Sequence, residues 1–246
     1  MSLFARLSAV SRKRKLELFH ETMRPAPSMR VLDLGAEIES AGDDCCKFMD
    51  QYPWKRMITA ANIDPRHVEK IARRYPEVEA VVADARSLPW PDKHFDIVYS
   101  NAVIEHVGTF EDQKRMASEV MRVGKRWFIT TPNRWYPFEF HLRLPFVTWL
   151  PGDAYLRCGR IIRYNHVRKR YVTGADCSGI RLMTAGELMR CFSGGRVIKQ
   201  RVTFMAETLI AVGELEAGKD SPACAEQTES QGRPASPSEP ARSGPD

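Results

Sequence analysis

The first pattern along the chain is helical. Between residues 3 and 23, apolar side chains recur every three or four positions, a spacing that places them on one face of an α-helix. These positions are Leu3, Leu7, Val10, Leu16, Phe19 and Met23. Pro25 and Pro27 follow, and proline does not continue a helix. We therefore expect residues 1–27 to form an N-terminal segment built on a basic amphipathic helix.

Short apolar runs then alternate with segments of helical period. The runs predict strands at residues 30–34, 57–63, 80–83, 95–99 and 127–131. Asp64 before Pro65 is typical of a helix N-cap, and Thr109 with Asp112 resembles a capping box. Gly124 is expected to end the helix that Thr109 begins. Strands that alternate with helices predict a parallel sheet covered by helices on both faces.

The alternation stops after Pro132. Residues 133–178 are rich in Arg, Tyr, Trp and Pro and are interpreted as an insertion. A helix is expected at residues 184–192, and strands at 197–202 and 208–212 then close the sheet as an antiparallel pair. The predicted fold class is α/β, a Rossmann-like doubly wound sheet of about seven strands, mostly parallel, with the last one antiparallel. The composition of residues 214–246 predicts a disordered tail.

The composition agrees with one domain. The chain has 246 residues, of which 43% are apolar, so it can bury a sizeable core. Its net charge of +6 is concentrated in two segments. Residues 1–30 contain seven Lys and Arg against two acids, and residues 134–170 contain eight against two. Two readings remain open, a solvated face or attraction to an acidic partner such as a membrane surface, a nucleic acid or a phosphorylated substrate.

The cysteine pattern favours a reduced, cytoplasmic setting. Six cysteines at positions 45, 46, 158, 177, 191 and 224 show neither CxxC pairs nor zinc spacing. The N-terminal residues MSLFARLSAVSRKRK carry charge where a signal peptide would be apolar. No apolar run reaches the roughly 18 residues of a membrane span. No histidine pairs with another ligand at metal spacing, so we expect no metal.

Polar residues lie at the ends of four of the predicted strands in turn. They are Asp33 and Gly35, Asn62 and Asp64, Asp84, and then Ser100 and Asn101. In an open parallel sheet, ligands bind outside the carboxyl ends of the strands, where the strand order reverses. Turns and helix caps also favour Asp, Asn and Gly, so each residue alone is a weak signal. Four strand ends in succession predict a ligand site at this edge of the sheet.

Three sequence motifs carry a family resemblance. VLDLG, NIDP and VVADARSLPWPDKHFDIVYSNAVIEHV resemble the class I S-adenosylmethionine-dependent methyltransferases, in particular those that act on small molecules. The resemblance covers residues 28–132 and more weakly 184–213, which implies a methyltransferase-like domain over 28–213. It departs from the usual DxGxGxG at Glu37 and Glu39. The implied cofactor is S-adenosylmethionine, and the implied reaction is methylation of O, N or C in a small acceptor.

The resemblance implies roles for individual residues around the first two strands. Asp33 would support the first loop, and Gly35 would let the methionine part of the cofactor approach the backbone. Asn62 stands where the family has an acid that binds the ribose hydroxyls, and an amide can still hydrogen-bond a diol. Asp64 is the alternative ribose ligand, although its position before Pro65 favours the cap role. Glu37 could accept from the cofactor's ammonium group.

The remaining cofactor contacts follow the third and fourth strands. Asp84, with Ala85 beside it, matches the acid that accepts from the adenine amino group. Asn101 and Ala102 would border the methionine and the sulfonium. For a catalytic base, His106 is the first candidate and His141 the second, with His166 also in the insertion. The alternative for His106 is to start or cap the next helix.

The insertion suits an acceptor site as well as a plain core that covers the sheet edge. Its apolar residues would form a wall and its arginines a charged rim, a combination that fits an amphiphilic or aromatic acceptor. The residues concerned are Trp135, Tyr136, Phe138, Phe140, Phe146, Trp149, Arg143, Arg157 and Arg160. The same mixture fits peripheral contact with the inner face of an anionic membrane.

Two other functions compete with the methyltransferase. A binding or scaffold protein that keeps the fold without the reaction is favoured by Glu37, Glu39 and Asn62. An RNA methyltransferase is supported only by the basic balance, and the chain shows no recognised RNA-binding module, so nucleic acid is the less favoured partner.

Overall fold

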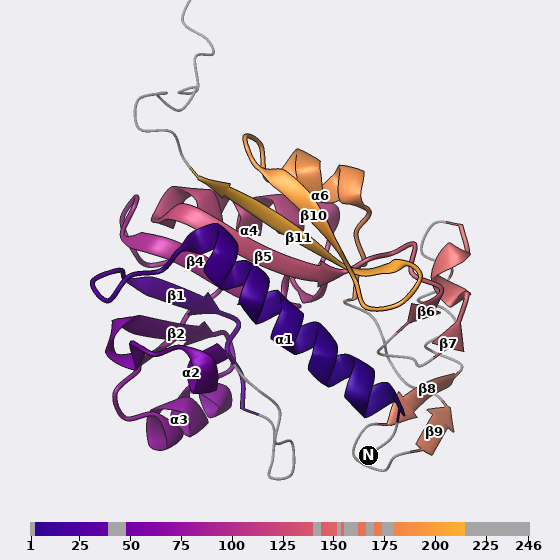
Figure 1. Cartoon of the computed structure of the whole chain (residues 1–246), viewed down its shortest axis with the longest axis horizontal. Coiled ribbons are helices and arrows are strands. Elements are labelled where there is room, and N and C mark those ends of the chain that lie inside the picture. Colours follow the sequence, from indigo (N-terminus) through magenta and orange to yellow (C-terminus); the bar gives the residue numbers. More distant parts are fainter. Residues whose placement is uncertain are drawn as a thin grey trace, which may run out of the picture. The chain divides into compact units, whose positions relative to one another are not determined.

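A seven-stranded sheet organises the part of the chain that the computed structural model describes, residues 3–38, 48–139, 144–151, 154, 162–165, 170–173 and 180–214. Its strand order is β10-β11-β5-β4-β1-β2-β3 (Figure 1). The strands are β1 (Val31–Leu34), β2 (Ile58–Asn62), β3 (Glu79–Val82), β4 (Phe95–Asn101), β5 (Gly124–Pro132), β10 (Arg196–Arg201) and β11 (Ala206–Glu214).

The first five strands are parallel, and β11 runs antiparallel to both of its neighbours, β5 and β10. The predicted fold class is thus confirmed, including the seven strands and the antiparallel last strand. The chain goes from β1 outward to β3 and then returns to β4 on the other side of β1. The strand order therefore reverses between β1 and β4, which is where such sheets bind ligands.

Local caps explain where the helices begin. The Asp64 side chain accepts a hydrogen bond from the Arg66 backbone N–H and caps α3 (Pro65–Arg74), as its position before Pro65 predicts. Thr109 and Asp112 form the predicted capping box of α4 (Phe110–Val123), which ends at Gly124. A second capping box, between Thr184 and Glu187, begins α6 (Ala185–Cys191).

Helices cover both faces of the sheet, and each face has its own apolar core. On one face α1 (Leu3–Met23), α2 (Phe48–Gln51) and α3 pack on alternate residues of the central strands, such as Ile97 and Phe128. On the other face α4 and α6 pack on the intervening residues, such as Val98 and Trp127. This alternation follows from the two-residue period of a strand, in which successive side chains point to opposite faces.

Helix α1 is fixed to the sheet by its C-terminal half. Phe19 is fully buried, and its ring makes edge contacts with Phe48, Tyr99 and Phe128 at 5.1–5.5 Å between centroids. Arg126 on β5 donates from Nη1 to the Met23 carbonyl at 2.7 Å. The helix then extends along the sheet toward the carboxyl ends of the strands (Figure 1). The predicted bounds of this helix are confirmed, and it belongs to the same compact unit as the sheet.

The insertion contributes only short elements among the described residues. They are β6 (Phe138–Glu139), β7 (Leu144–Pro145), the 3-10 helix η3 (Val147–Trp149), β8 (Ile162–Asn165) and β9 (Arg170–Thr173). Two further 3-10 helices are η1 (Lys55–Met57) and η2 (Ile104–His106). Phe140, His141, Arg143, Arg157, Arg160 and His166 lie outside the described residues, as do Glu39 and the proposed tail from 215 onward.

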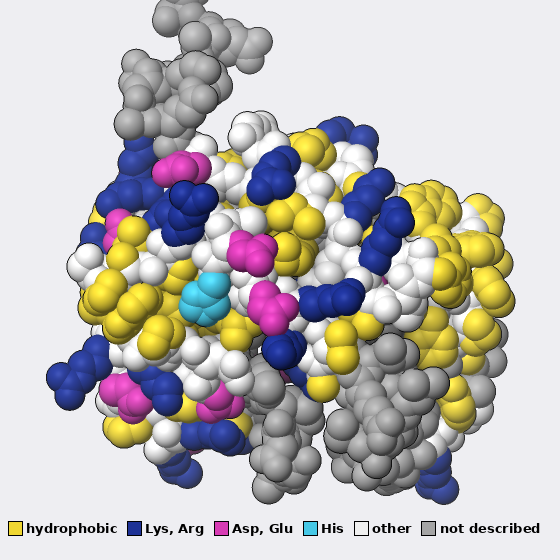
Figure 2. All heavy atoms as spheres, in the orientation of Figure 1, with side chains coloured by type: hydrophobic (Ala, Val, Ile, Leu, Met, Phe, Trp, Pro, Cys, Tyr) yellow, Lys and Arg dark blue, Asp and Glu magenta, His cyan; other side chains and the backbone are white. Residues whose placement is uncertain are grey.

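Three of the described aromatics of the insertion do not fit the reading of this segment as a core. Trp135, Phe146 and Trp149 are 52%, 57% and 48% exposed, so these three side chains are not a core that covers the sheet edge. Trp149 donates from its indole N–H to the Trp135 carbonyl and packs edge-on against Phe146. Figure 2 shows hydrophobic side chains gathered on this side of the molecule, where Figure 1 places β6 and β7.

Candidate functional site

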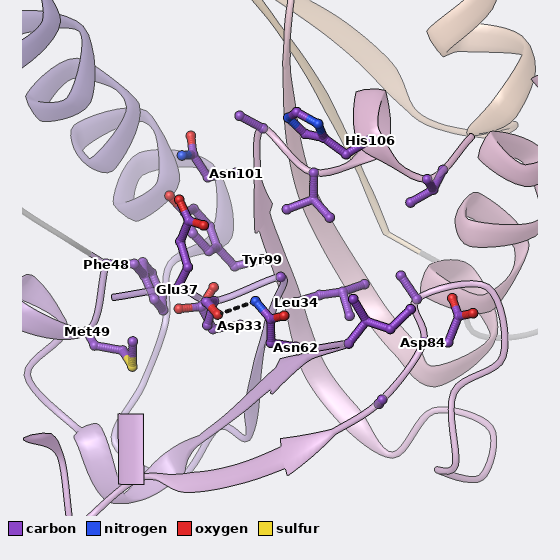
Figure 3. A pocket seen from close by; sticks show the side chains of 18 of the residues that line it. Asp33, Leu34, Glu37, Phe48, Met49, Asn62, Asp84, Tyr99, Asn101 and His106 are labelled. Carbon is purple, nitrogen blue, oxygen red and sulfur yellow. Dashed lines mark hydrogen bonds between the residues drawn. The ribbon is translucent and has the colours of Figure 1, made fainter. Parts of the chain in front are cut away.

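A cavity of about 630 Å³ opens at the carboxyl ends of β1, β2 and β4 and beside the segment that follows β3. This volume lies within the range of small-molecule sites. From the strand ends and the segments after them come Asp33, Gly35, Ala36, Glu37, Asn62, Ala83, Asp84, Ala85, Asn101, Ala102 and His106. The sequence-predicted cofactor residues and His106 thus meet in one place, with the exception of Asp64 (Figure 3). The described aromatics that were predicted to wall an acceptor site do not line this cavity, namely Trp135, Tyr136, Phe138, Phe146 and Trp149.

The first loop requires glycine at position 35. Gly35 has φ +80°, and a Cβ there would lie 2.3 Å from Cγ2 of Val103. Both the left-handed backbone and the close approach of Val103 therefore exclude larger residues. The N–H groups of Gly35 and Ala36 both donate to the Ala61 carbonyl, at 2.8 and 3.1 Å, which ties the loop to β2.

The residues after Gly35 explain how the loop dispenses with further glycines over the part that is described. Ala36 and Ile38 are buried in the core beneath α1 and α2, whereas Glu37 between them is exposed and lines the cavity. The two buried side chains therefore fix the backbone of the loop on both sides of Glu37. Glu37 can therefore present a carboxylate to a ligand without leaving the loop unsupported.

Asn62 holds the loop from the neighbouring strand. Its Nδ2 donates to the Ala36 carbonyl at 2.7 Å, and its Oδ1 accepts from the Asp64 N–H at 2.8 Å. One N–H and one lone pair of the amide remain for a ligand. Asp64 caps α3, pairs with Arg66 at 2.6 Å and is not among the residues that line the cavity. The Asp64 pKa is lowered to about 2, mainly because its carboxylate accepts from Arg66.

Asp84 lies at the other end of the cavity from Glu37 and Asn101 (Figure 3). The guanidinium of Arg86 binds its carboxylate through Nε at 3.0 Å and Nη2 at 2.7 Å. These hydrogen bonds lower the Asp84 pKa and keep the carboxylate ionised. An ionised carboxylate is an acceptor only, so this end of the cavity suits a donor such as an exocyclic amine.

Asn101 and Ala102 end β4 at the point where the strand order reverses. The Asn101 Oδ1 accepts from the Thr130 hydroxyl and from Lys15 Nζ, both at 2.8 Å. Ala102 has φ +57°, a left-handed conformation that is uncommon outside glycine, and its N–H donates to the Thr130 carbonyl at 3.0 Å. The backbone therefore turns away sharply here and leaves room in front of the strand.

His106, the first candidate base, is the last residue of η2. Its side chain is exposed and lines the cavity. It does not cap the following helix, because Thr109 does so. The neighbouring Glu105 is fully buried and accepts from the Thr131 hydroxyl at 3.0 Å.

Sequence reasoning missed the part of the site that comes from helices α1 and α2. Arg12, Lys15 and Leu16 reach the cavity from α1, and Phe48 and Met49 from α2. A signal was present for Lys15, since it lies one turn before Phe19 and two turns before Met23, on the helix face that is buried. A lysine on the apolar face of a helix needs a polar partner, and here that partner is Asn101.

Among the described residues, no group of three or more side chains of the metal-ligating types comes together. None of the helices in the described ranges is long and apolar enough to cross a membrane.

The reversed strand order and the cavity in front of it define a Rossmann-like α/β ligand-binding domain. Residues 39–127 match the family model described as a methyltransferase domain. The chain is 34% identical over 79 residues to Rv3030 of Mycobacterium tuberculosis, named a probable S-adenosylmethionine-dependent methyltransferase. This central segment is thus similar to S-adenosylmethionine-dependent methyltransferases, in agreement with the resemblance in its motifs. The match covers 32% of this chain and 29% of Rv3030, so the chain spans less than a third of that relative.

Solved structures extend the likeness of the fold beyond this segment. The PH0226 protein from Pyrococcus horikoshii superposes with a TM-score of 0.54 at 20% identity, over 83% of this chain and 89% of that one. A SAM-dependent methyltransferase from Methanosarcina mazei superposes with a TM-score of 0.52 at 16% identity, over 81% of this chain and 98% of that one. At these identities the likeness concerns the fold alone.

Proposed function

We propose that this protein transfers a methyl group from S-adenosylmethionine to a small acceptor. The observation that carries the proposal is the cavity at the switch point of the sheet, which unites the strand-end residues. Its hydrogen-bond acceptors suit this cofactor, which carries an adenine amine at one end and a sulfonium and an ammonium at the other. Asp84 and Glu37 supply carboxylate acceptors at opposite ends of the cavity (Figure 3).

The first loop supports the same proposal. A dinucleotide-binding loop needs glycines so that the pyrophosphate can approach the N-terminus of a helix. S-adenosylmethionine contains no phosphate, so a loop that binds it does not have this requirement. Side chains at the buried positions Ala36 and Ile38 are therefore compatible with this ligand. The exposed Glu37 can accept a hydrogen bond from its ammonium group. When bound, the cofactor supplies an electrophilic methyl group. The chain's own part is to orient it and to hold the acceptor in line with it.

Calorimetry with S-adenosylmethionine and with its demethylated product, S-adenosylhomocysteine, tests the proposal. We expect both to bind, and we expect Asp84→Ala to weaken them by about 1–3 kcal/mol, or about 5-fold to 150-fold, since a buried hydrogen bond is lost. Asp92→Ala is the matched control, because the Asp92 side chain is 76% exposed and outside the cavity. Absence of binding at millimolar ligand would favour the scaffold alternative. An unchanged affinity in Asp84→Ala would show that the adenine does not bind at Asp84.

We propose further that the acceptor is amphiphilic and reaches the protein at an anionic membrane surface. The support is the exposed aromatic patch, which we define as Trp135, Phe146, Trp149 and Leu150. Their exposed fractions of 40–57% put four large apolar side chains in solvent. Figure 2 shows hydrophobic side chains gathered on the side of the molecule where Figure 1 places β6 and β7. Exposed patches of this kind mark interaction sites, and tryptophan favours the interface between water and lipid.

Sedimentation with vesicles of phosphatidylglycerol and phosphatidylcholine tests the membrane contact. We expect binding to anionic vesicles that falls at least several-fold in the double variant Phe146→Ser, Trp149→Ser. Val82→Ser is the control, since Val82 is 51% exposed on the edge strand β3, away from the patch. Equal binding by all three proteins, or none by the wild type, would contradict the proposal.

A further inference from the structure

Lys15 is the one lysine that the described part of the chain directs into the cavity. It lies on α1, one turn before the buried Phe19, and its Nζ reaches over the end of β4 to Asn101 Oδ1 at 2.8 Å. The helix is held on both sides of this point. Phe19 anchors it to the core, and Ser11 bonds Glu207 and Gln200 on β11 and β10. The amine is thus positioned by the fold and not by a mobile side chain alone.

Charged groups surround this amine from three elements. Arg12 follows from α1 itself, Glu105 from η2 and Glu207 from β11. The two carboxylates are buried, at 0% and 6% exposure, and each accepts a hydrogen bond from another donor. Glu105 accepts from Thr131, and Glu207 accepts from the backbone N–H of Val202 at 2.9 Å. Glu37 and His106 also border the cavity.

The balance of these influences makes the neutral amine easier to reach than in an ordinary lysine. Burial is the largest effect and the positive charge of Arg12 the second, while Glu105 and Glu207 oppose them. Together they lower the Lys15 pKa from its ordinary value near 10.5 to about 8. A neutral amine can donate to Asn101 and still keep its lone pair for a proton.

We propose that Lys15 is the catalytic base that takes the acceptor's proton during methyl transfer. This inference rests on the proposed function, which supplies the cofactor and its orientation. The acceptor O–H or N–H gives its proton to Nζ, and the acceptor atom forms a bond to the methyl carbon. The bond between that carbon and sulfur breaks, and its electron pair stays on sulfur. The products are the methylated acceptor, a neutral thioether and a lysine ammonium.

The electrostatics of the cavity favour this assignment over His106. Before the reaction the positive charge lies on the sulfonium and Lys15 is neutral, and afterwards sulfur is neutral and Lys15 is charged. The total charge of the cofactor sulfur and Lys15, which lie near Arg12 and the buried carboxylates, therefore stays constant during the reaction. A charge that only moves between two neighbouring groups costs less than an additional charge created at the same place. His106 is exposed at the end of η2 and gains less from this constancy.

The proposal predicts that the two ligands differ in the proton release that accompanies their binding. This difference can be measured without the methyl acceptor. The sulfonium should expel the proton from Lys15, whereas the thioether should not. At pH 8 we expect S-adenosylmethionine to release about half a proton more than S-adenosylhomocysteine, because the free lysine is then about half charged. Between pH 7 and 9, the affinity ratio of the first ligand to the second should rise by up to about tenfold.

Titration calorimetry in buffers of different ionisation enthalpy measures both quantities. Lys15→Met should bind both ligands with a ratio that no longer changes with pH beyond the ligands' own titration. Lys15→Arg should keep a low ratio throughout, since its cation persists. Lys13→Met is the matched control, since the Lys13 side chain is 78% exposed on the same helix, and it should behave as the wild type.

The outcomes separate the two proposals. If neither ligand binds the wild type, the proposed function fails and the inference with it. If both bind but the wild type shows no difference in proton release, or if Lys15→Met retains it, the cofactor site stands and Lys15 is not the base.

Discussion

Two residues that line the cavity have a left-handed backbone conformation. Gly35 has φ +80° and Ala102 has φ +57°, and Val103, next to Ala102, packs directly on Gly35. The ends of β1 and β4 are thus locked together across the switch point. Of this pair only Gly35 could be predicted, because glycine after a strand is a turn signal, whereas the chain gives no sign that an alanine will be left-handed.

The Gly35–Val103 contact can be tested through stability. Gly35→Ala should destabilise the fold by at least about 1–2 kcal/mol, the cost of a left-handed residue with a Cβ, with a further cost from overlap with Val103. Urea denaturation of the wild type, Gly35→Ala, Val103→Ala and the double variant measures the coupling. The glycine substitution should cost less when Val103 is already alanine. Strict additivity of the two changes would show that the side chains do not meet.

Some of the side chains that line the cavity could likewise be predicted from the sequence, and others could not. Asp33, Asp84 and Asn101 lie at the ends of predicted strands, so their convergence could be predicted from the rule for parallel sheets. Lys15 joins Asn101 across 86 positions of the sequence, and nothing local indicates that partner. Asn62 gives an intermediate case. Its place at the end of β2 was predicted, but its hydrogen bond to the Ala36 carbonyl depends on the path of the loop.

At the level of elements, caps and periodicity carry most of the information. Helices α1, α3, α4 and α6 begin where their N-caps or apolar spacing predict, and the five parallel strands fall within three residues of the predicted bounds. The short elements η2, β6 and β7 were not predicted, because two or three residues show no period. Their form depends on tertiary contacts, such as the hydrogen bond of the Phe146 N–H to the Pro137 carbonyl.

The capping box of α4 can be measured in isolation. Thr109 accepts from the Asp112 N–H at 3.2 Å, and the Asp112 carboxylate accepts from the Thr109 N–H at 2.9 Å. Thr109→Ala should therefore lower the free energy of unfolding by about 1 kcal/mol. Thr109→Ser keeps the oxygen and should lie close to the wild type in urea denaturation. If serine and alanine were equally destabilising, the effect would come from the lost methyl group and not from the cap.

On the scale of the whole molecule, one helix connects the first and the last parts of the sheet. Helix α1 packs on Phe128 of β5 and contributes to the core that includes Ile210 and Val212 of β11. One turn before Phe19, the same helix places Lys15 over β4. The amphipathic pattern predicts the helix but not the surface to which it binds, since any apolar face of the sheet would satisfy it. The long-range packing therefore decides which residues complete the cavity.

The interior place of β11 has a consequence for how the chain is made. This strand is the last described element to be synthesised, yet it pairs on one side with β5 and on the other with β10. Until residues 206–214 have left the ribosome, β5 has an unpaired edge, and Leu209 and Ala211 are not there to fill the core beside α4 and α6. An unpaired edge of this kind is open to wrong partners. During translation the nascent chain therefore carries an exposed β5 edge until the ninth residue of β11 appears.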